Sequence, residues 1–226
     1  QKMFCSCAQE ADYILLMART DTEAPKHKGI TMLLLDPKSP GVTLRKLDKL
    51  GLRPMDINEI FLDDVHIPSE NVIGSVNEGW TNVLKTLDFE RCCLSAVNVG
   101  AAQKALNLAI DYSKERAQFG QPISSFQFTR GKLVDMQMEI DSARLLVYRS
   151  AWLVDPGIAN PMQSAMANLS SSETYVRTAL DGMRIFGGWG YLMEFDMQRH
   201  FRDSKLAEIG GGTSEILRLL ISREIL

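Results

Sequence analysis

The fold is decided by the stretch Asn77–Arg116, which reads NEGWTNVLKTLDFERCCLSAVNVGAAQKALNLAIDYSKER. Apolar residues recur in it at helical spacing, as at Leu84, Leu87 and Leu94, and it contains no proline. At 1.5 Å per residue, one continuous helix over this stretch would be roughly 60 Å long. A helix of that length is typical of a helical bundle.

Three further helical patterns follow. The first runs from Pro122 to Val154, the second from Asn160 to Phe186, and the third from Thr213 to the end of the chain. Glycine or proline-glycine pairs close the first two. Together with the long helix, they predict a C-terminal four-helix bundle domain over residues 74–226.

Residues 1–73 have the pattern of strands. Short apolar runs at Tyr13–Ala18, Ile30–Leu35 and Asn58–Leu62 are separated by turn-forming residues. We therefore predict the second half of a β domain, part of a barrel, and an α+β fold class with the boundary near Gly74. Because the sequence begins as if in the middle of a strand, we expect a fragment of a longer protein.

Composition gives little evidence for large charged partners. The 226 residues carry 25 basic and 28 acidic side chains, a net charge of −3, so neither nucleic acid nor a membrane is indicated. The cysteines form two close pairs, Cys5/Cys7 and Cys92/Cys93, whose spacings match neither a zinc knuckle nor a Cys-x-x-Cys redox motif. We expect them to be small buried side chains in a reducing compartment, with no metal site.

Two short segments carry residues suited to chemistry. Gly210–Gly212 is a glycine turn that opens a helix, where backbone N–H groups can approach a ligand closely and the helix end favours anions. Leu87–Arg91 places acidic and basic side chains inside an otherwise apolar helix, where burial of charge is costly without a purpose.

Both segments resemble the acyl-CoA dehydrogenase family of flavoenzymes. Leu62–Gly74 also resembles the strand-to-helix junction of that family, and Glu115–Gln127 the segment between its first two bundle helices. Arg184–Tyr191 is similar to its glycine-rich segment, although Arg184 stands where glutamine is usual. The resemblance covers essentially the whole chain and implies that an N-terminal helical domain and the first half of the barrel are missing.

The resemblance also implies where the catalytic base lies. Many members carry a glutamate in the glycine turn, at the position of Gly211. A minority, including isovaleryl-CoA and long-chain dehydrogenases, carry it on the upstream helix, at the position of Glu90. The implied catalytic residues are therefore Glu90, as the base, and Gly211, whose backbone N–H would stabilise the substrate oxygen. We expect Glu90 to be buried among apolar neighbours, which would raise its pKa.

In this family the base removes the α-proton of an acyl thioester while the β-hydrogen leaves as hydride to flavin N5, giving a trans-2-enoyl thioester. The resemblance thus implies FAD as cofactor, an acyl-CoA as substrate and an electron-transfer flavoprotein as partner, in fatty acid or amino acid catabolism. The implied substrate-binding residues are Asp88, Arg91, Gly210 and Gly212.

The implied FAD site is composite. One strand would face the flavin ring, while other segments would reach the dinucleotide half across a subunit interface, so we expect a homo-oligomer, a dimer of dimers. The implied cofactor-binding residues are Phe4, Cys5, Ser6, Arg116, Gln118, Phe119, Gln127, Arg184, Ile185, Phe186, Gly187, Gly188, Thr213, Ser214 and Glu215.

Two alternatives stay open. The same scaffold could work in the reductive direction, as in enoyl-CoA or crotonobetainyl-CoA reductases. It could also be a non-catalytic member that binds flavin or a partner protein. The lack of a glutamate at Gly211 favours this alternative, and the presence of Glu90 argues against it. The family implies a bacterial cytoplasmic protein, with the mitochondrial matrix as the alternative.

Overall fold

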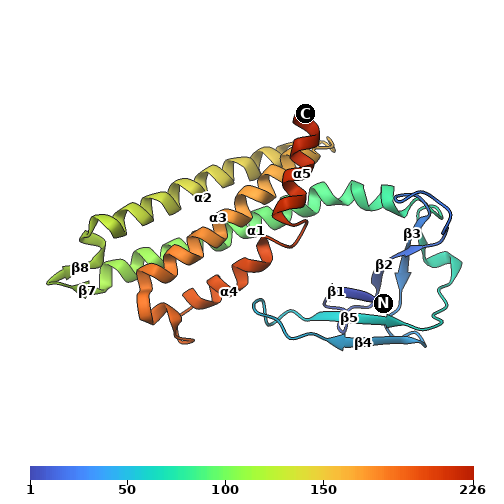
Figure 1. The fold of residues 1–226 in the computed structure, drawn as a ribbon, viewed down its shortest axis with the longest axis horizontal. Helices are drawn as coiled ribbons and strands as arrows, with labels where there is room; N and C mark the ends of the chain where they lie inside the picture. The colour runs from blue at the N-terminus through green and yellow to red at the C-terminus, as the bar shows by residue number, and fades with distance from the viewer. The chain divides into compact units, whose positions relative to one another are not determined.

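The computed structural model describes residues 1–226, which form two compact units, Gln1–Thr86 and Leu87–Leu226. We refer to them as the β unit and the helical unit (Figure 1). The long helix α1, Gly79–Glu115, begins in the β unit and continues through the helical unit.

The β unit contains two antiparallel three-stranded sheets. The first has the order β1-β5-β4 and the second the order β2-β3-β6. Their strands are β1 (Lys2–Ser6), β2 (Ile14–Arg19), β3 (Ile30–Leu35), β4 (Val42–Lys46), β5 (Ile57–Leu62) and β6 (Val72–Ile73), with the short 3-10 helix η1 (Ser69–Asn71) before β6. Ala8, Ile14, Leu16, Leu35 and Ile60 form the buried core.

The three predicted apolar runs appear as β2, β3 and β5, and the α+β class is confirmed. The two sheets form no closed barrel, so the partial barrel stays a prediction. The sequence pattern also missed β4 and the two-residue strand β6.

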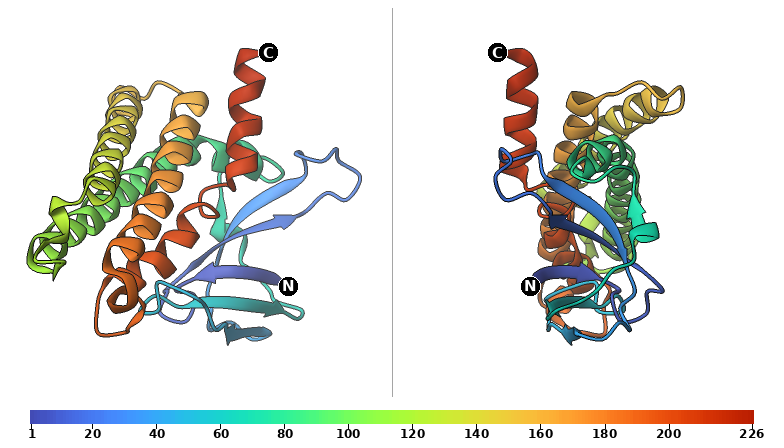
Figure 2. Two further views of the ribbon diagram at one scale, coloured as in Figure 1. Left: turned by 60° about the vertical axis from the view of Figure 1, so that its left-hand side comes forward. Right: turned by 90° about the vertical axis from the view of Figure 1, so that its right-hand side faces the viewer.

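The helical unit is built around α3 (Figures 1 and 2). Helix α3 contacts α2, α4 and α5, and it has more buried residues than any other helix. After α1 the elements are the hairpin β7 (Ala117–Gln118) and β8 (Gln121–Pro122), η2 (Ile123–Ser125), α2 (Gln127–Val154), α3 (Pro161–Phe186), η3 (Gly187–Tyr191), α4 (Met197–Ala207) and α5 (Ser214–Ile225). Side chains from α1, α2, α3 and α4 share one apolar core.

The four predicted helices are present as α1, α2, α3 and α5, with α2 and α3 ending at the expected residues. The four-helix description is nevertheless not confirmed, because α4 is a fifth helix. Its buried face consists of Met197, Gln198, His200 and Ser204, which are mostly polar. A search for apolar residues at helical spacing therefore does not detect it.

No helix is both long and apolar enough to cross a membrane. All four cysteines are free thiols, and only Cys92 is buried, whereas Cys93 is exposed. The expectation that all four are buried was therefore wrong for Cys93. Neighbouring residues on a helix point in directions about 100° apart, so both members of this pair cannot face the core.

The buried His200 predicts a pH-dependent stability. Burial lowers its pKa, as do the nearby charges of Arg199 and Lys104, while Asp196 and Asp203 raise it. Its Nδ1 lies 3.0 Å from the hydroxyl of Tyr175, and its Nε2 has no partner. Because the folded pKa lies below the unfolded value of about 6.5, the unfolded chain takes up a proton first as pH falls.

We therefore expect the free energy of unfolding to decrease below pH of about 6.5, by at most about 1.4 kcal/mol per pH unit from this group. In His200→Asn this part of the pH dependence should disappear, as measured by denaturant unfolding between pH 7 and pH 5. The exposed His66 supplies the control variant, His66→Asn. Equal pH slopes in wild type and His200→Asn would contradict the assignment.

Candidate active site

The glycine turn connects α4 to α5 through backbone conformations that favour glycine. Gly211 has φ +71° and Gly212 has φ +118°, both in the region that side chains disfavour. The side chain of Thr213 caps α5 by accepting a hydrogen bond from the N–H of Ile216 at 3.4 Å. The turn therefore presents its backbone groups at the beginning of a helix, as the sequence predicted.

Two buried side chains bind the carbonyl groups of this turn. The Nε of Arg91 donates to the carbonyl of Gly211 at 3.1 Å, and the Nδ2 of Asn168 donates to that of Gly210 at 3.5 Å. Arg91 is 7% exposed and Asn168 is fully buried. Helices α1 and α3 therefore each hold one peptide group of the turn.

Asp88 connects Arg91 with the beginning of α3. Its Oδ2 accepts the backbone N–H of Asn160 at 2.9 Å, and its Oδ1 accepts the hydroxyl of Ser164 at 2.9 Å. The Nη1 of Arg91 lies 3.9 Å from the same Oδ1. Burial lowers the pKa of Arg91, and the charges of Asp88 and Glu90 oppose this shift. Both oxygens of Asp88 are thus engaged within the protein.

Glu90 is exposed in the helical unit, so the expectation of burial was wrong. Phe89, which is 61% exposed, and Val97, which is 66% exposed, also project from α1. A helix turns by about 100° per residue, so Arg91 faces inward while its neighbour Glu90 points away.

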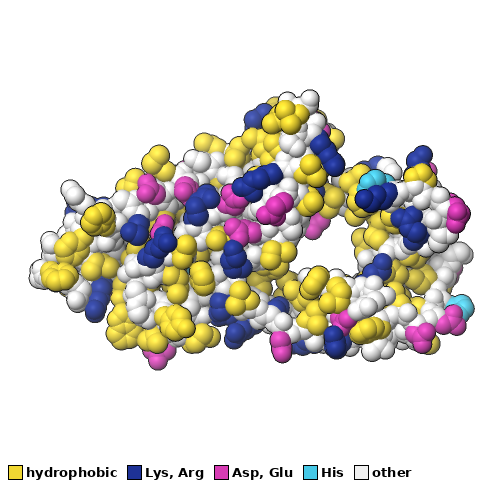
Figure 3. Space-filling view, in the orientation of Figure 1, with side chains coloured by type: hydrophobic (Ala, Val, Ile, Leu, Met, Phe, Trp, Pro, Cys, Tyr) yellow, Lys and Arg dark blue, Asp and Glu magenta, His cyan; other side chains and the backbone are white.

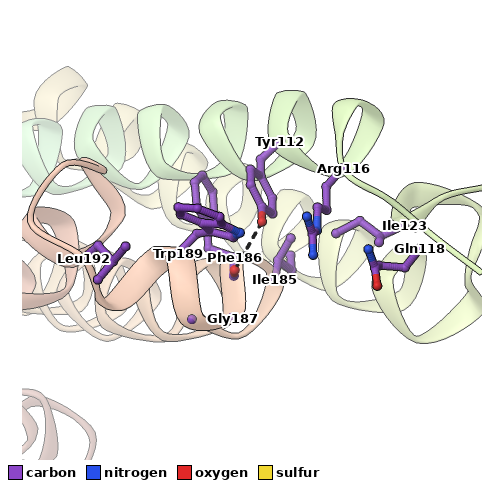
Figure 4. Close-up of a pocket in the computed structure, with 10 residues that line it drawn as sticks. Tyr112, Arg116, Gln118, Ile123, Ile185, Phe186, Gly187, Trp189 and Leu192 are labelled. Carbon is purple, nitrogen blue, oxygen red and sulfur yellow. Dashed lines mark hydrogen bonds between the residues drawn. The ribbon is translucent and has the colours of Figure 1, made fainter.

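A cavity of about 440 Å³ lies beside the β7–β8 hairpin, and we call it the hairpin pocket (Figure 4). Arg116 and Gln118 project into it from one side, and Phe186 and Trp189 from another (Figure 4). Phe186 stacks on Tyr112 with ring centroids 4.1 Å apart. The full lining comprises Tyr112, Arg116, Gln118, Ile123, Ile185, Phe186, Gly187, Gly188, Trp189 and Leu192.

The pocket unites two groups of sequence-predicted residues, the pair Arg116 and Gln118 and the segment Ile185–Gly188. Three further predicted residues from the same two stretches of sequence do not line the pocket. Phe119 is 93% exposed, Gln127 is exposed at the start of α2, and Arg184 pairs with Asp181 at 2.8 Å.

Sequence reasoning missed four residues of the lining, namely Tyr112, Ile123, Trp189 and Leu192. Tyr112 precedes Arg116 by four residues on α1, so helical spacing could have revealed it. Leu192 follows η3 and carries no comparable signal.

A second cavity, of about 390 Å³, lies at the beginning of α5, and we call it the α5 pocket. The predicted residues Thr213, Ser214 and Glu215 line it together with Ile209. Charged residues complete the lining, namely Glu173, Lys205, Glu208 and Arg218, which form the pairs Arg218–Glu173 and Lys205–Glu208. The backbone N–H of Glu215 and the hydroxyl of Thr213 lower the pKa of the Glu215 carboxyl.

In the β unit, the predicted segment Phe4-Cys5-Ser6 lies on β1. The register of β1 against β5 shifts between Lys2 and Cys5, and Phe4 has φ 62° with 73% of its surface exposed. Positive φ is a genuine outlier for a bulky side chain. Ser6 is also exposed, whereas Cys5 is half-buried. Two of the three residues are thus available to a ligand.

Comparison with protein families identifies both units. The model of the acyl-CoA dehydrogenase middle domain matches residues 1–65, and that of the acyl-CoA dehydrogenase C-terminal domain matches residues 77–226. The chain belongs to the acyl-CoA dehydrogenase family. The family resemblance found in the sequence is therefore confirmed.

Individual relatives agree with this result. A probable acyl-CoA dehydrogenase, YngJ, of Bacillus subtilis is 41% identical over 100% of this chain and 60% of its own length. The mitochondrial isovaleryl-CoA dehydrogenase of Solanum tuberosum is 40% identical over 99% of this chain and 54% of its own. Butyryl-CoA dehydrogenase from Megasphaera elsdenii superposes with a TM-score of 0.95 at 35% identity, covering 99% of this chain and 58% of that one. The chain thus spans less than two thirds of the length of these relatives.

The contacts of Asp88 predict its contribution to stability. Asp88→Asn removes the charge that accepts two hydrogen bonds and faces Arg91, and hydrogen bonds to charged groups contribute about 1.5–3 kcal/mol each. We expect the free energy of unfolding to fall by about 2 kcal/mol in denaturant titrations. The exposed Asp135 on α2 supplies the control, Asp135→Asn. A loss no larger than that of the control would show that the contacts are unimportant.

Proposed function

We propose that the full-length protein catalyses the FAD-dependent α,β-dehydrogenation of an acyl-CoA thioester to a trans-2-enoyl-CoA, with Glu90 as the base. The observation that carries the proposal is that Gly211 carries no carboxylate and sits where a side chain would be crowded and would adopt a disfavoured φ. A Cβ there would lie 2.9 Å from Cδ1 of Leu94 and 3.0 Å from Nδ2 of Asn168. A base therefore has to come from another element.

Helix α1 supplies that base. Leu94, which packs against Gly211, follows Glu90 by four residues, and residues at this spacing share one face of a helix. Glu90 thus lies one helical turn from the side chain that reaches the glycine turn. Its exposure leaves the carboxylate accessible to a substrate. A carboxylate in hydrogen-bond reach of the α-carbon could remove the proton.

The remaining groups of the turn have electrostatic roles in this proposal. The backbone N–H of Gly211 donates to the thioester oxygen as negative charge develops there, while Gly210, Gly212 and Arg91 line the substrate site. Bound FAD would accept the β-hydrogen as hydride. Because both oxygens of Asp88 are engaged, we assign it to the support of Arg91 and α3 rather than to direct substrate contact.

The residues of the hairpin pocket suit the dinucleotide half of FAD. The guanidinium of Arg116 is a donor for a pyrophosphate, and the exposed Gly187 and Gly188 leave the backbone open to close approach. Tyr112 and Phe186 offer apolar surface beside them. We assign Phe4 and Ser6 to the flavin ring and the α5 pocket to a further part of the same cofactor. In functional terms, we place the domain boundary near Gly74, between the two matched segments.

The surface of the helical unit favours association with further copies of the chain. Figure 3 shows apolar side chains gathered at the end that carries the β7–β8 hairpin, where Phe119 and Phe128 are 93% and 89% exposed. Exposed apolar residues also follow one face of α2, namely Val134, Met138, Leu145, Tyr148 and Trp152. Contiguous exposed apolar surface of this kind marks an interaction site. We propose a dimer of dimers that passes electrons to an electron-transfer flavoprotein.

Anaerobic mixing of the full-length protein with a panel of acyl-CoA thioesters tests the function. We expect the flavin absorbance to bleach with at least one chain length. A flavin that stays oxidised with every saturated acyl-CoA would reject dehydrogenation. If, in addition, an enoyl-CoA reoxidises the chemically reduced protein, the protein is a reductase.

Glu90→Gln tests the base, because glutamine keeps the size of the side chain but removes its basicity. We expect the rate of flavin reduction to fall by about 10²–10⁴-fold, with flavin content unchanged. Glu224→Gln, at an exposed position near the end of α5, is the matched control. Nearly normal turnover in Glu90→Gln would eliminate Glu90 as the base.

A further inference from the structure

The peptide group between Gly210 and Gly211 contains both a bound carbonyl and the proposed N–H donor. The chain has no cis peptide bonds, so in this peptide the C=O and the N–H point in opposite directions. Whatever fixes the carbonyl of Gly210 therefore also fixes the direction of the N–H of Gly211. In the structure, that group is the side-chain amide of Asn168.

Asn168 is held firmly enough to serve this purpose. It lies on α3, four residues after Ser164, whose hydroxyl binds Asp88. Its side chain is fully buried, and Nδ2 lies 3.0 Å from the Cβ position of Gly211. On the next peptide, the Nε of Arg91 binds the carbonyl of Gly211. The turn is thus held at two consecutive peptide groups.

The amide of Asn168 is costly for folding. Its Oδ1 is buried and has no hydrogen-bond partner. An unsatisfied buried polar atom costs about 1–3 kcal/mol, whereas a hydrocarbon side chain of similar shape would avoid that cost. The bond to Gly210 contributes no more to stability than the unpartnered Oδ1 costs, so stability alone gives little reason for asparagine at this position.

We propose that Asn168 is a positioning residue that aims the N–H of Gly211 at the thioester oxygen of the substrate. The proposal rests on the proposed function and adds to it a residue that does not touch the substrate. Preorganised donors of this kind stabilise charge that develops in the transition state, and their value depends on direction. Without Asn168 only the next peptide is held, by Arg91, and the N–H of Gly211 loses its alignment.

Asn168→Leu removes the donor and keeps a side chain of similar size. We expect kcat to fall by about 10²-fold, the effect of a misplacement of about 1 Å, with KM and flavin content little changed. In the bound enoyl-CoA product, the C=O stretching frequency should move toward that of the free thioester, because the hydrogen bond that lowers it is weakened. A crystal structure of the variant should show the carbonyl of Gly210 turned away from its wild-type direction.

Asn168→Asp provides a second, isosteric test. As a buried carboxyl group it should have a raised pKa, and only its protonated form can donate to the carbonyl of Gly210. The ratio of its kcat to that of wild type should therefore rise as pH falls, while the ratio for Asn168→Leu should stay constant. Thr178→Val is the matched control, since Thr178 also lies buried on α3 with an unpartnered hydroxyl. Its kinetics should equal those of wild type.

The outcomes separate the two proposals. If no acyl-CoA reduces the flavin of wild type, the proposed function fails and the positioning role fails with it. If wild type is active but Asn168→Leu has normal kcat and an unshifted C=O frequency, only the positioning role is overturned. If Asn168→Leu does not fold, the pH dependence of the Asn168→Asp ratio decides, and a constant ratio overturns the role.

Discussion

The carboxylate of Asp88 is the interaction on which the candidate site depends. It accepts hydrogen bonds from the first residues of α3, at Asn160 and Ser164, and faces the guanidinium of Arg91 on its own helix. Arg91 then reaches one carbonyl of the glycine turn, and Asn168 on α3 reaches the other. One charged group thus sets the relation between α1, α3 and the turn. Such a group stabilises only where its partners are all present, because an unpaired buried charge is costly.

Most of the fold could be predicted because most elements bury apolar side chains at regular spacing. The ends of α2 and α3 followed from proline and glycine at Pro156-Gly157 and Gly187-Gly188. Helix α4 could not be predicted in this way, since its buried positions include Gln198, His200 and Ser204. Its close contact with α3 at Gly182, where a Cβ would lie 2.4 Å from Sδ of Met197, is likewise a tertiary feature.

In the candidate site, too, local features could be predicted from the sequence and tertiary contacts could not. The glycine turn and the beginning of a helix at Thr213 were predicted from the sequence, because each follows from local backbone chemistry. The contact of Asn168 with the turn could not be predicted, since nothing in a helical sequence shows which buried amide meets the carbonyl of a distant turn. The expected burial of Glu90 failed because apolar neighbours in sequence do not determine which face of a helix turns inward.

The crowding at Gly211 has a consequence for how such a site changes over generations. A glutamate in the turn would have to shift the ends of the Leu94 and Asn168 side chains and adopt an unfavourable φ, so this substitution alone would be strained. A side chain in this turn would therefore require compensating substitutions at Leu94 or Asn168, which is a case of mutational epistasis.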